Sequence, residues 1–422
     1  MNNNNINNID LEAGLDSPAT ISRTTPVKNG DDSNSISSAT LVHPSNSYLA
    51  FRIRHFSPAW FSAVMGLGVS SAILYSFPFP HEGLRIAGMA VWGINVLFFT
   101  LCLTMFVLRF ILYPEQLKRM LLHPGQSMFL GCLPMGFATI INVLHLMSQD
   151  YDMPGTWVAC YVMWWIDTFL SIASCWGVCY LMFVYQKRPN LEAINPTIFL
   201  PIVPLVVASA TGALIATSLP QSLKASTLIV SFMMWANGQL LAIACMAIYL
   251  ARLFLKSTQP GAIILSTLLP VGPMGQGAFG ILLLGDLYKQ VFAPYSTKHY
   301  TGIIEVTPQS VDAISFVTMA VALFLIGVGL FWLTLAAFFT LTTPPPGYNM
   351  SWWATTFPIG TMAMAWYHLE AEFNNSGLKY IGALFGCVVL MNVCICFVGA
   401  IKHAIIKNTV FVQAKNETSP EE

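Results

Sequence analysis

The chain has 422 residues and a formal net charge of zero, with 55% apolar and only 9% charged residues. A water-soluble domain normally carries about 25% charged residues, so this composition excludes a soluble globular protein and indicates one that faces lipid. The balanced charge also provides no basic field for binding nucleic acid.

The two ends of the sequence differ in composition from its middle. Residues 1–50 begin with an asparagine run and continue in Ser, Thr, Asn, Asp and Pro. Such a segment cannot bury enough apolar area to offset the entropy of ordering, which predicts a disordered cytosolic N-terminal tail. We expect residues 404–422 to be a cytosolic C-terminal tail, which leaves residues 51–403 as the membrane-embedded domain.

The middle of the chain contains ten apolar stretches, each about as long as a membrane-spanning helix. A helix needs roughly 20 apolar residues to cross the hydrocarbon core of a bilayer. The sequence therefore predicts an all-α membrane protein with ten transmembrane helices. The stretches cover residues 56–77, 86–111, 127–147, 156–185, 195–218, 225–255, 261–284, 311–341, 351–369 and 377–402.

The basic residues indicate how these spans are oriented. If both termini are cytosolic, fourteen of the nineteen Lys and Arg residues lie on the cytosolic side and five on the other side. Cytosolic segments of membrane proteins carry such an excess, so an even number of spans with both termini inside is expected. We expect a multi-pass protein of the cell (plasma) membrane, in contact with the lipid bilayer.

Proline divides the ten spans into two kinds. Every odd-numbered span contains at least one proline and no even-numbered span contains any. Proline bends or breaks a helix, and the freed backbone groups must face protein or an aqueous cavity inside a membrane. The pattern predicts five helical hairpins around a central pore, with proline-kinked odd helices inside and even helices outside. The prolines are Pro58, Pro134, Pro201, Pro204, Pro270, Pro273 and Pro358.

The odd spans also lack Lys, Arg, Asp and Glu altogether. Their polar groups are neutral hydroxyls and amides, such as Thr139, Asn142, Gln276 and Thr361. A pore conducts when its groups bind an ion favourably but weakly, and neutral donors together with broken helix ends suit an anion. A cation pathway would more often include an acidic residue. The inner spans therefore predict a conduit for a small anion.

Asp167 is the one acidic residue well inside a span, and it lies on an even span with no basic partner visible in the sequence. Intramembrane acids are costly and usually functional, so Asp167 is either a structural acid or a coupling acid. His, Asp and Glu are otherwise dispersed along the chain, and the nine cysteines lie in apolar runs without surrounding ligands. We therefore expect no catalytic site, no metal site and no cofactor.

Five segments, one in each of the first, third, fourth, seventh and ninth spans, resemble a known family in order along the chain. They are Met65–Pro80, Pro134–Asn142, the Trp164-Trp165-Ile166-Asp167 element, Gly272–Asp286 and Trp352–Met362. Together they resemble the tellurite-resistance/dicarboxylate transporter family, which has the slow-anion-channel fold, and within it the fungal sulfite efflux pumps. The resemblance extends over about residues 51–403.

This resemblance implies a fold of five hairpins and a pore in each protomer of a homo-oligomer. In the family a Phe on the ninth helix occludes the pore, and the matching residue here is Phe357, just before Pro358. An aromatic side chain in an uncharged constriction can act as a hydrophobic gate. Residues expected to line the pore or to kink its helices are Pro58, Gly66, Pro134, Gly136, Pro204, Gly272, Pro273, Gln276, Gly277 and Pro358.

The combined expectation is a plasma-membrane exporter of sulfite or hydrogen sulfite, with an uncharged pore gated by Phe357, which would give sulfite tolerance. The alternative is a malate or dicarboxylate permease, or another anion channel, of the same fold. A membrane enzyme would cluster His, Asp or Glu near one interface, and a sensor would need a folded soluble module. The sequence favours neither of these two classes.

Overall fold

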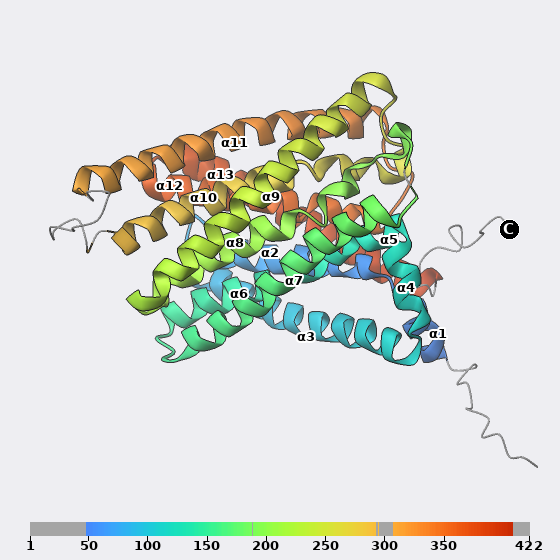
Figure 1. Ribbon diagram of the computed structural model, residues 1–422, viewed down its shortest axis with the longest axis horizontal. Coiled ribbons are helices and arrows are strands. Elements are labelled where there is room, and N and C mark those ends of the chain that lie inside the picture. The colour runs from blue at the N-terminus through green and yellow to red at the C-terminus, as the bar shows by residue number, and fades with distance from the viewer. Residues whose placement is uncertain (1–47, 188, 293, 295–306, 408–422) are drawn as a thin grey trace, which may run out of the picture. The chain divides into compact units, whose positions relative to one another are not determined.

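A computed structural model describes residues 48–187, 189–292, 294 and 307–407. Every regular element within these residues is a helix, so the expected all-α class is confirmed for the described part of the chain. Figure 1 shows the long helices lying side by side. Most of the predicted tails 1–50 and 404–422 lie outside the described residues, apart from the start of α1 (Tyr48–Arg54) and the end of α13 (Ser376–Lys407).

Nine helical segments in the described part are long and apolar enough to cross a membrane. They correspond to nine of the ten predicted spans. They are Pro58–Tyr75, Glu82–Leu112, Pro124–Asp150, Thr156–Val184, Pro196–Ser218, Gln221–Leu255, Gly261–Phe292, Pro308–Thr342 and Ser376–Lys402. The predicted span 351–369 forms a short 3-10 segment and then α12 (Phe357–Phe373), an α-helix of only 17 residues.

The odd and even spans differ in how their helices are built. Each even span is one uninterrupted α-helix. These helices are α3 (Glu82–Leu112), α7 (Thr156–Val184), α9 (Gln221–Leu255), α11 (Pro308–Thr342) and α13. Each odd span is a 3-10 segment followed by an α-helix. These pairs are η1 (Pro58–Trp60) with α2 (Phe61–Tyr75), η2 (Met128–Gly131) with α6 (Cys132–Asp150), η4 (Pro196–Phe199) with α8 (Val203–Ile215), η6 (Gly261–Leu268) with α10 (Val271–Phe292), and η8 (Met350–Thr355) with α12.

The prolines explain where these α-helices begin. Pro204 and Pro358 occupy the first turn of α8 and α12, and Pro134 and Pro273 are the third residues of α6 and α10. The first N–H groups of a helix have no intrahelical acceptor, so proline is tolerated there. We expected these prolines to bend or break their spans. The structure has a break near the start of each span rather than a bend in its middle, because the preceding residues adopt 3-10 geometry.

The α-helices of the five odd spans contact one another in a closed ring. α2 contacts α6, α6 contacts α8, α8 contacts α10, α10 contacts α12, and α12 contacts α2. The helix of each even span packs in the groove between two members of this ring: α3 on α2 and α6, α7 on α6 and α8, α9 on α8 and α10, α11 on α10 and α12, and α13 on α12 and α2. We call the first five the inner ring and the other five the peripheral helices.

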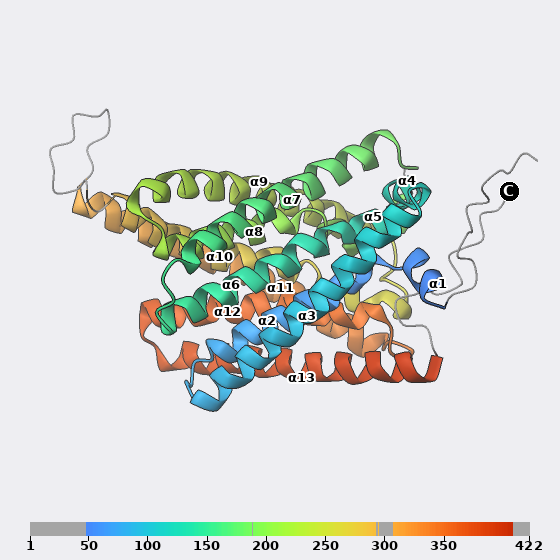
Figure 2. The same cartoon turned by 90° about the horizontal axis from the view of Figure 1, so that it is seen from below.

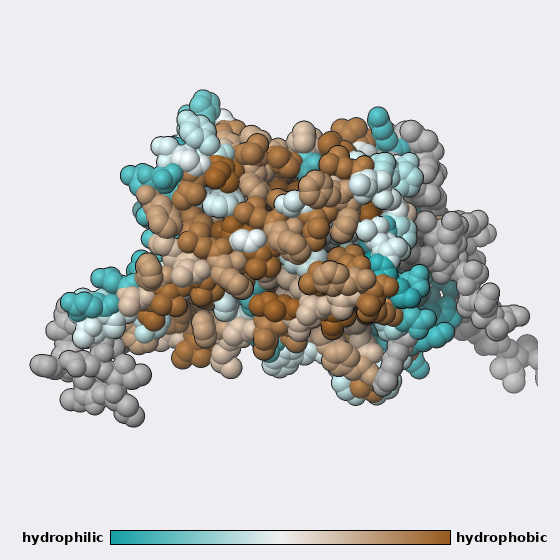
Figure 3. Space-filling model, turned by 90° about the horizontal axis from the view of Figure 1, so that it is seen from above, coloured by the Kyte–Doolittle hydropathy of each residue, from teal (hydrophilic) through white to brown (hydrophobic). Residues whose placement is uncertain are grey.

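Burial separates these two sets. In the most apolar stretches of the segments containing α2, α6, α8 and α10, 67–100% of the residues are buried, against 22–33% in the peripheral helices. The peripheral helices expose large apolar side chains such as Leu97, Phe169 and Phe324. Figure 3 shows apolar residues covering the middle of one face, with hydrophilic residues gathered toward both ends. So broad an apolar surface is typical of contact with lipid.

Tryptophans join three peripheral helices to the inner ring. Trp92 Nε1 of α3 donates to the Ile140 carbonyl of α6 at 3.1 Å, Trp164 Nε1 of α7 donates to the Ala208 carbonyl of α8 at 2.8 Å, and Trp235 Nε1 of α9 donates to the Gly277 carbonyl of α10 at 2.9 Å. A carbonyl has two lone pairs, so it can accept this bond in addition to its helical one. In each case the acceptor lies on the next inner helix along the chain.

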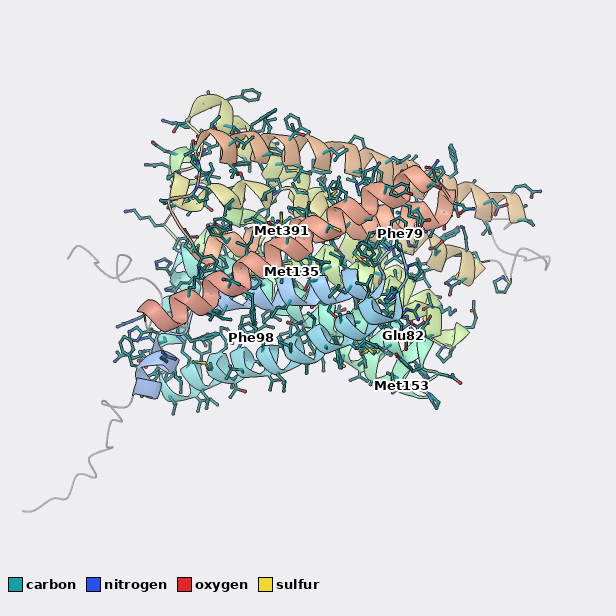
Figure 4. The ribbon with its side chains drawn as sticks, turned by 180° about the vertical axis from the view of Figure 1, so that it is seen from behind. Phe79, Glu82, Phe98, Met135, Met153 and Met391 are labelled. Atoms are coloured by element: carbon teal, nitrogen blue, oxygen red, sulfur yellow. The ribbon has the colours of Figure 1, made fainter. Side chains whose placement is uncertain are left out.

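Two connections between inner and peripheral helices lie at the same end of the bundle. Figure 4 labels Phe79 and Glu82 at the turn between α2 and α3, and Met153 at the turn between α6 and α7. Helices α1 and α4 (Glu115–Leu122) lie at the opposite end (Figures 1 and 2). The inner helices therefore run in one direction and the peripheral helices return.

Candidate functional site

A cavity lies inside the inner ring and is lined by residues from all five of its helices. Its empty volume is about 480 Å³, part of it open to solvent. The lining residues are Val69, Ala72, Thr139, Asn142, Leu146, Val207, Leu214, Gln276, Phe279, Phe357, Thr361 and Met364. None of these side chains is charged.

Four polar side chains face this cavity, and two of them already have partners. The Thr139 hydroxyl donates to the Gly136 carbonyl at 2.7 Å, and the Thr361 hydroxyl donates to the Pro358 carbonyl at 2.8 Å. The amides of Asn142 and Gln276 have no hydrogen bond to any described residue, and Asn142 Oδ1 is buried. An amide NH₂ group offers two donors. These two amides are therefore the donors available to an anion in the cavity.

The positions of the lining residues along their helices show the order in which they follow one another from one end of the cavity to the other. On α12, Phe357 comes first, Thr361 follows one turn later, and Met364 lies about 10 Å beyond Phe357 at 1.5 Å per residue. On α6, the order is Thr139, Asn142 and Leu146. Since the inner helices run in one direction, the polar groups lie between Phe357 and an apolar set that includes Leu146 and Met364.

Phe357 is the first residue of α12 and is 5% exposed. The chain before it is the 3-10 segment η8, and Pro358 follows in the first helical turn. The break in this inner span thus places an aromatic ring at the beginning of the cavity. Phe357 and Gln276 are the two residues from the expected pore set that line it.

The other residues of that set are buried at helix contacts rather than in the cavity wall. A Cβ atom at Gly66 would lie 2.6 Å from Thr356 Oγ1, and one at Gly136 would lie 2.9 Å from Val64 Cγ1. Gly277 faces Gln239 of the peripheral helix α9. These glycines permit close helix approach. The remaining members, Pro58, Pro134, Pro204, Gly272, Pro273 and Pro358, are buried at or near the starts of the inner α-helices.

Asp167 lies on the peripheral helix α7 and is completely buried. Neither carboxylate oxygen has a hydrogen-bond partner within the described residues, and the side chain does not line the central cavity. His145 of α6 is also buried, and its Nε2 atom lies 3.0 Å from the Thr217 hydroxyl. Both groups are thus separate from the neutral lining.

The expectation that His, Asp and Glu are dispersed was wrong for one group. His368 Nε2 lies 2.9 Å from Asp286 Oδ2, and Glu372 is next to them. The ring contact between α10 and α12 brings Asp286 and His368 together across 82 positions of sequence. Sequence spacing gave no signal for this pair, because only the packing of the two helices joins them.

Comparison with known proteins gives consistent matches over most of the chain. The family model described as "Voltage-dependent anion channel" matches residues 55–401. A sulfite efflux pump from Arthroderma benhamiae is 35% identical over 343 residues, covering 80% of this chain and 88% of the relative. A sulfite efflux pump from Candida albicans is 28% identical over 392 residues, covering 86% and 77%. A putative malic acid transport protein from Schizosaccharomyces pombe is 25% identical over 348 residues, covering 81% and 78%.

Proposed function

The chain belongs to the voltage-dependent anion channel family, and we propose that it exports sulfite or hydrogen sulfite from the cytosol through the cavity inside the inner ring. The family match confirms the resemblance drawn from the motifs, and it makes this chain a membrane transporter of small anions. The single observation that carries the proposal is the uncharged cavity, lined by all five inner helices and holding two free amides.

The proposed architecture is ten membrane-crossing helices in five hairpins. The ninth span, which is not among the nine long segments, combines η8 with α12. Its 6 residues of 3-10 helix and 17 of α-helix reach about 37 Å at rises of about 2.0 and 1.5 Å per residue. A hydrocarbon core is about 30 Å thick, so this segment is long enough to cross it. Both termini then lie in the cytosol, and we place the protein in the plasma membrane.

The anion would be recognised by amide groups and expelled by the membrane potential. Asn142 and Gln276 would replace part of its hydration shell, and the lack of a positive side chain in the lining would keep binding weak. Exposed basic residues on α1 and α4, namely Arg54, Lys118 and Arg119, would concentrate anions at the cytosolic end. An inside-negative potential favours outward movement by about 2.3 kcal/mol per charge per 100 mV.

Phe357 is the proposed gate. It lies at the start of the cavity, before the polar groups. It is the first residue of α12, directly after the 3-10 segment η8. A change in the 3-10 segment or in the first turn of α12 would move the ring. An apolar ring in an uncharged passage excludes water and hydrated ions until it moves.

The test is sulfite flux in liposomes containing the purified full-length chain. We expect Phe357→Ala to raise flux at least severalfold, because the ring no longer closes the passage. Phe324→Ala, at an exposed position of the peripheral helix α11, is the matched control and should leave flux unchanged. Unchanged flux in a folded Phe357→Ala protein would show that Phe357 is not the gate. The absence of sulfite flux in the wild-type protein would overturn the proposal.

A dicarboxylate permease is the second candidate, because one relative is named a putative malic acid transport protein. A doubly charged carboxylate substrate would favour a basic side chain in the cavity, and none lines it. Malate uptake by the same liposomes separates the two functions. Malate transport at a rate comparable to sulfite would favour the permease. Association into a homo-oligomer stays a prediction.

A further inference from the structure

A second hollow lies where α10, α11 and α12 meet, separate from the central cavity. Its empty volume is about 210 Å³, and its polar lining includes Asp286, Lys289, Ser315, His368 and Glu372. His368 also contacts Phe279 edge to face, with the ring centroids 6.2 Å apart. The hollow is therefore one side chain away from the central cavity, because Phe279 lines that cavity.

Three potential metal ligands converge in this hollow from two helices. His368 and Glu372 are one turn apart on α12, so they share a helix face. Asp286 approaches from α10, and one ligand atom from each of the three residues lies within 4.8 Å of the other two. The Ser315 hydroxyl of α11, which also lines the hollow, is buried without a hydrogen-bond partner in the described part of the chain.

This donor set fits a zinc-like ion. Zinc binds imidazole nitrogen and carboxylate oxygen at about 2.0–2.2 Å, which places ligands of a tetrahedral site about 3.3 Å apart. The His368 and Asp286 atoms are already 2.9 Å apart, and Glu372 is exposed and free to rotate toward them. Ser315 would offer its hydroxyl to a water molecule in the fourth position.

We propose that Asp286, His368 and Glu372 form a binding site for a divalent transition-metal ion of the zinc class, joining α10 to α12 beside the pore. One imidazole and two carboxylates suit such ions, whereas Mg²⁺ and Ca²⁺ prefer oxygen alone. Binding would fix two helices that line the central cavity, at the end we propose to be extracellular.

Lys289 is the feature that opposes this site. Its Nζ atom lies 3.7 Å from Asp286 Oδ1, and its side chain is 36% exposed. A bound cation would compete with this ammonium group for the carboxylate, and the lysine would turn toward solvent. The competing explanation is a metal-free network in which Lys289 and His368 both bind Asp286. Lys289 distinguishes the two, because its removal strengthens a metal site and weakens an ion-pair network.

The experiment is zinc titration of the purified full-length protein without a polyhistidine tag, by calorimetry and by the shift in unfolding temperature. We expect one zinc per chain and a zinc-dependent rise in unfolding temperature, since binding to the folded state stabilises it. His368→Gln and Glu372→Gln should weaken binding at least about tenfold, because the first removes the imidazole and the second the carboxylate charge, and loss of even an outer-shell partner costs about 10–100-fold in metal affinity. Lys289→Met should strengthen binding severalfold. His81→Gln, at an exposed turn, is the matched control and should bind as the wild type does.

Two results would overturn the site. One is the absence of zinc binding at millimolar concentration. The other is equal zinc affinity of the wild type and of Glu372→Gln. Residue 372 is exposed, so this substitution should not disturb folding. A Lys289→Met protein that binds zinc no better and is less stable without it would assign the cluster to the ion-pair network.

Discussion

The inner ring and the peripheral helices are both apolar, but protein surrounds the inner helices on all sides, whereas the peripheral helices leave much of their surface exposed. Inner helices meet through glycines, as where a Cβ atom at Gly275 of α10 would lie 2.6 Å from the Met362 amide nitrogen of α12. Peripheral helices use glycines as well, as at Gly88 of α3, where a Cβ atom would lie 3.0 Å from the Tyr75 amide nitrogen of α2, and they add long side chains such as Trp235 of α9, which donates to the Gly277 carbonyl of α10. On α11, a Cβ atom at Gly327 would meet nothing within 4 Å.

This difference shows where sequence changes should matter in a membrane-embedded bundle. Lipid is as apolar as a leucine side chain, so burial of apolar surface contributes little to helix association. Close backbone packing and interhelical hydrogen bonds decide it instead. Substitutions that fill space in the inner ring should therefore be the most damaging, and those on the lipid-facing surface the least.

The largest effect is expected for Gly131→Ala at the end of η2, directly before α6 of the inner ring. A Cβ atom at Gly131 would lie 1.9 Å from the Leu200 carbonyl oxygen, and backbone cannot rotate away as a flexible side chain can. We expect the free energy of unfolding to fall by about 3 kcal/mol or more, at the upper end of overpacking costs. Thermal unfolding in detergent measures the change.

Gly327→Ala is the matched control for this test. Its position on α11 is exposed and has open space for a Cβ atom, so the unfolding temperature should stay the same or rise slightly. Similar losses in both proteins would contradict the contrast between the ring and the periphery.

The next effect concerns function and is expected for Gln276→Glu, which adds a negative charge to the neutral cavity. At an effective dielectric constant of about 20, two unit charges 5 Å apart repel by about 3 kcal/mol, so sulfite flux should fall at least about a hundredfold. Gln276→Met removes the donor without adding charge and should reduce flux less. Gln276 lines the cavity. Wild-type flux through Gln276→Glu would mean that the anion takes another route.

The smallest effect is expected for Trp235→Phe, which removes the indole donor to the Gly277 carbonyl at 2.9 Å. Interhelical hydrogen bonds in membrane proteins contribute about 1 kcal/mol, so the unfolding temperature should fall by a few degrees. Trp165→Phe on the peripheral helix α7 is the control, because Trp165 is exposed and donates no hydrogen bond to a described residue. Equal unfolding temperatures of the two variants would show that the tryptophan hydrogen bonds do not stabilise the contacts between peripheral and inner helices.

Much of the helical pattern could be predicted from the sequence because its causes are local. Apolar length predicted the helices, and nine of the ten predicted spans correspond to helical segments long and apolar enough to cross a membrane. Proline position marked which spans are broken, since a missing N–H acts within one turn of helix. The sequence could not show that each break is a 3-10 segment followed by a new α-helix, because this depends on how the segments pack at the start of each inner helix.

The candidate site, like the fold, was only partly predictable from the sequence. Its neutrality was predictable, since every charged residue is absent from the odd spans, and Gln276 and Phe357 were among the expected pore residues. The sequence could not show which inner-span residues line the cavity and which glycines lie at helix contacts, because a helix presents both kinds of position within one turn.

The sequence by itself determined the class of protein, the position of its helices and the absence of charge along the inner spans. Only the tertiary structure decided which amides remain free to meet an anion, and that Asp286 and His368 share one hollow. The physical reason is the range of the interactions. Helix formation and proline breaks act over a few residues, whereas the closed ring joins residues that are 82 positions apart.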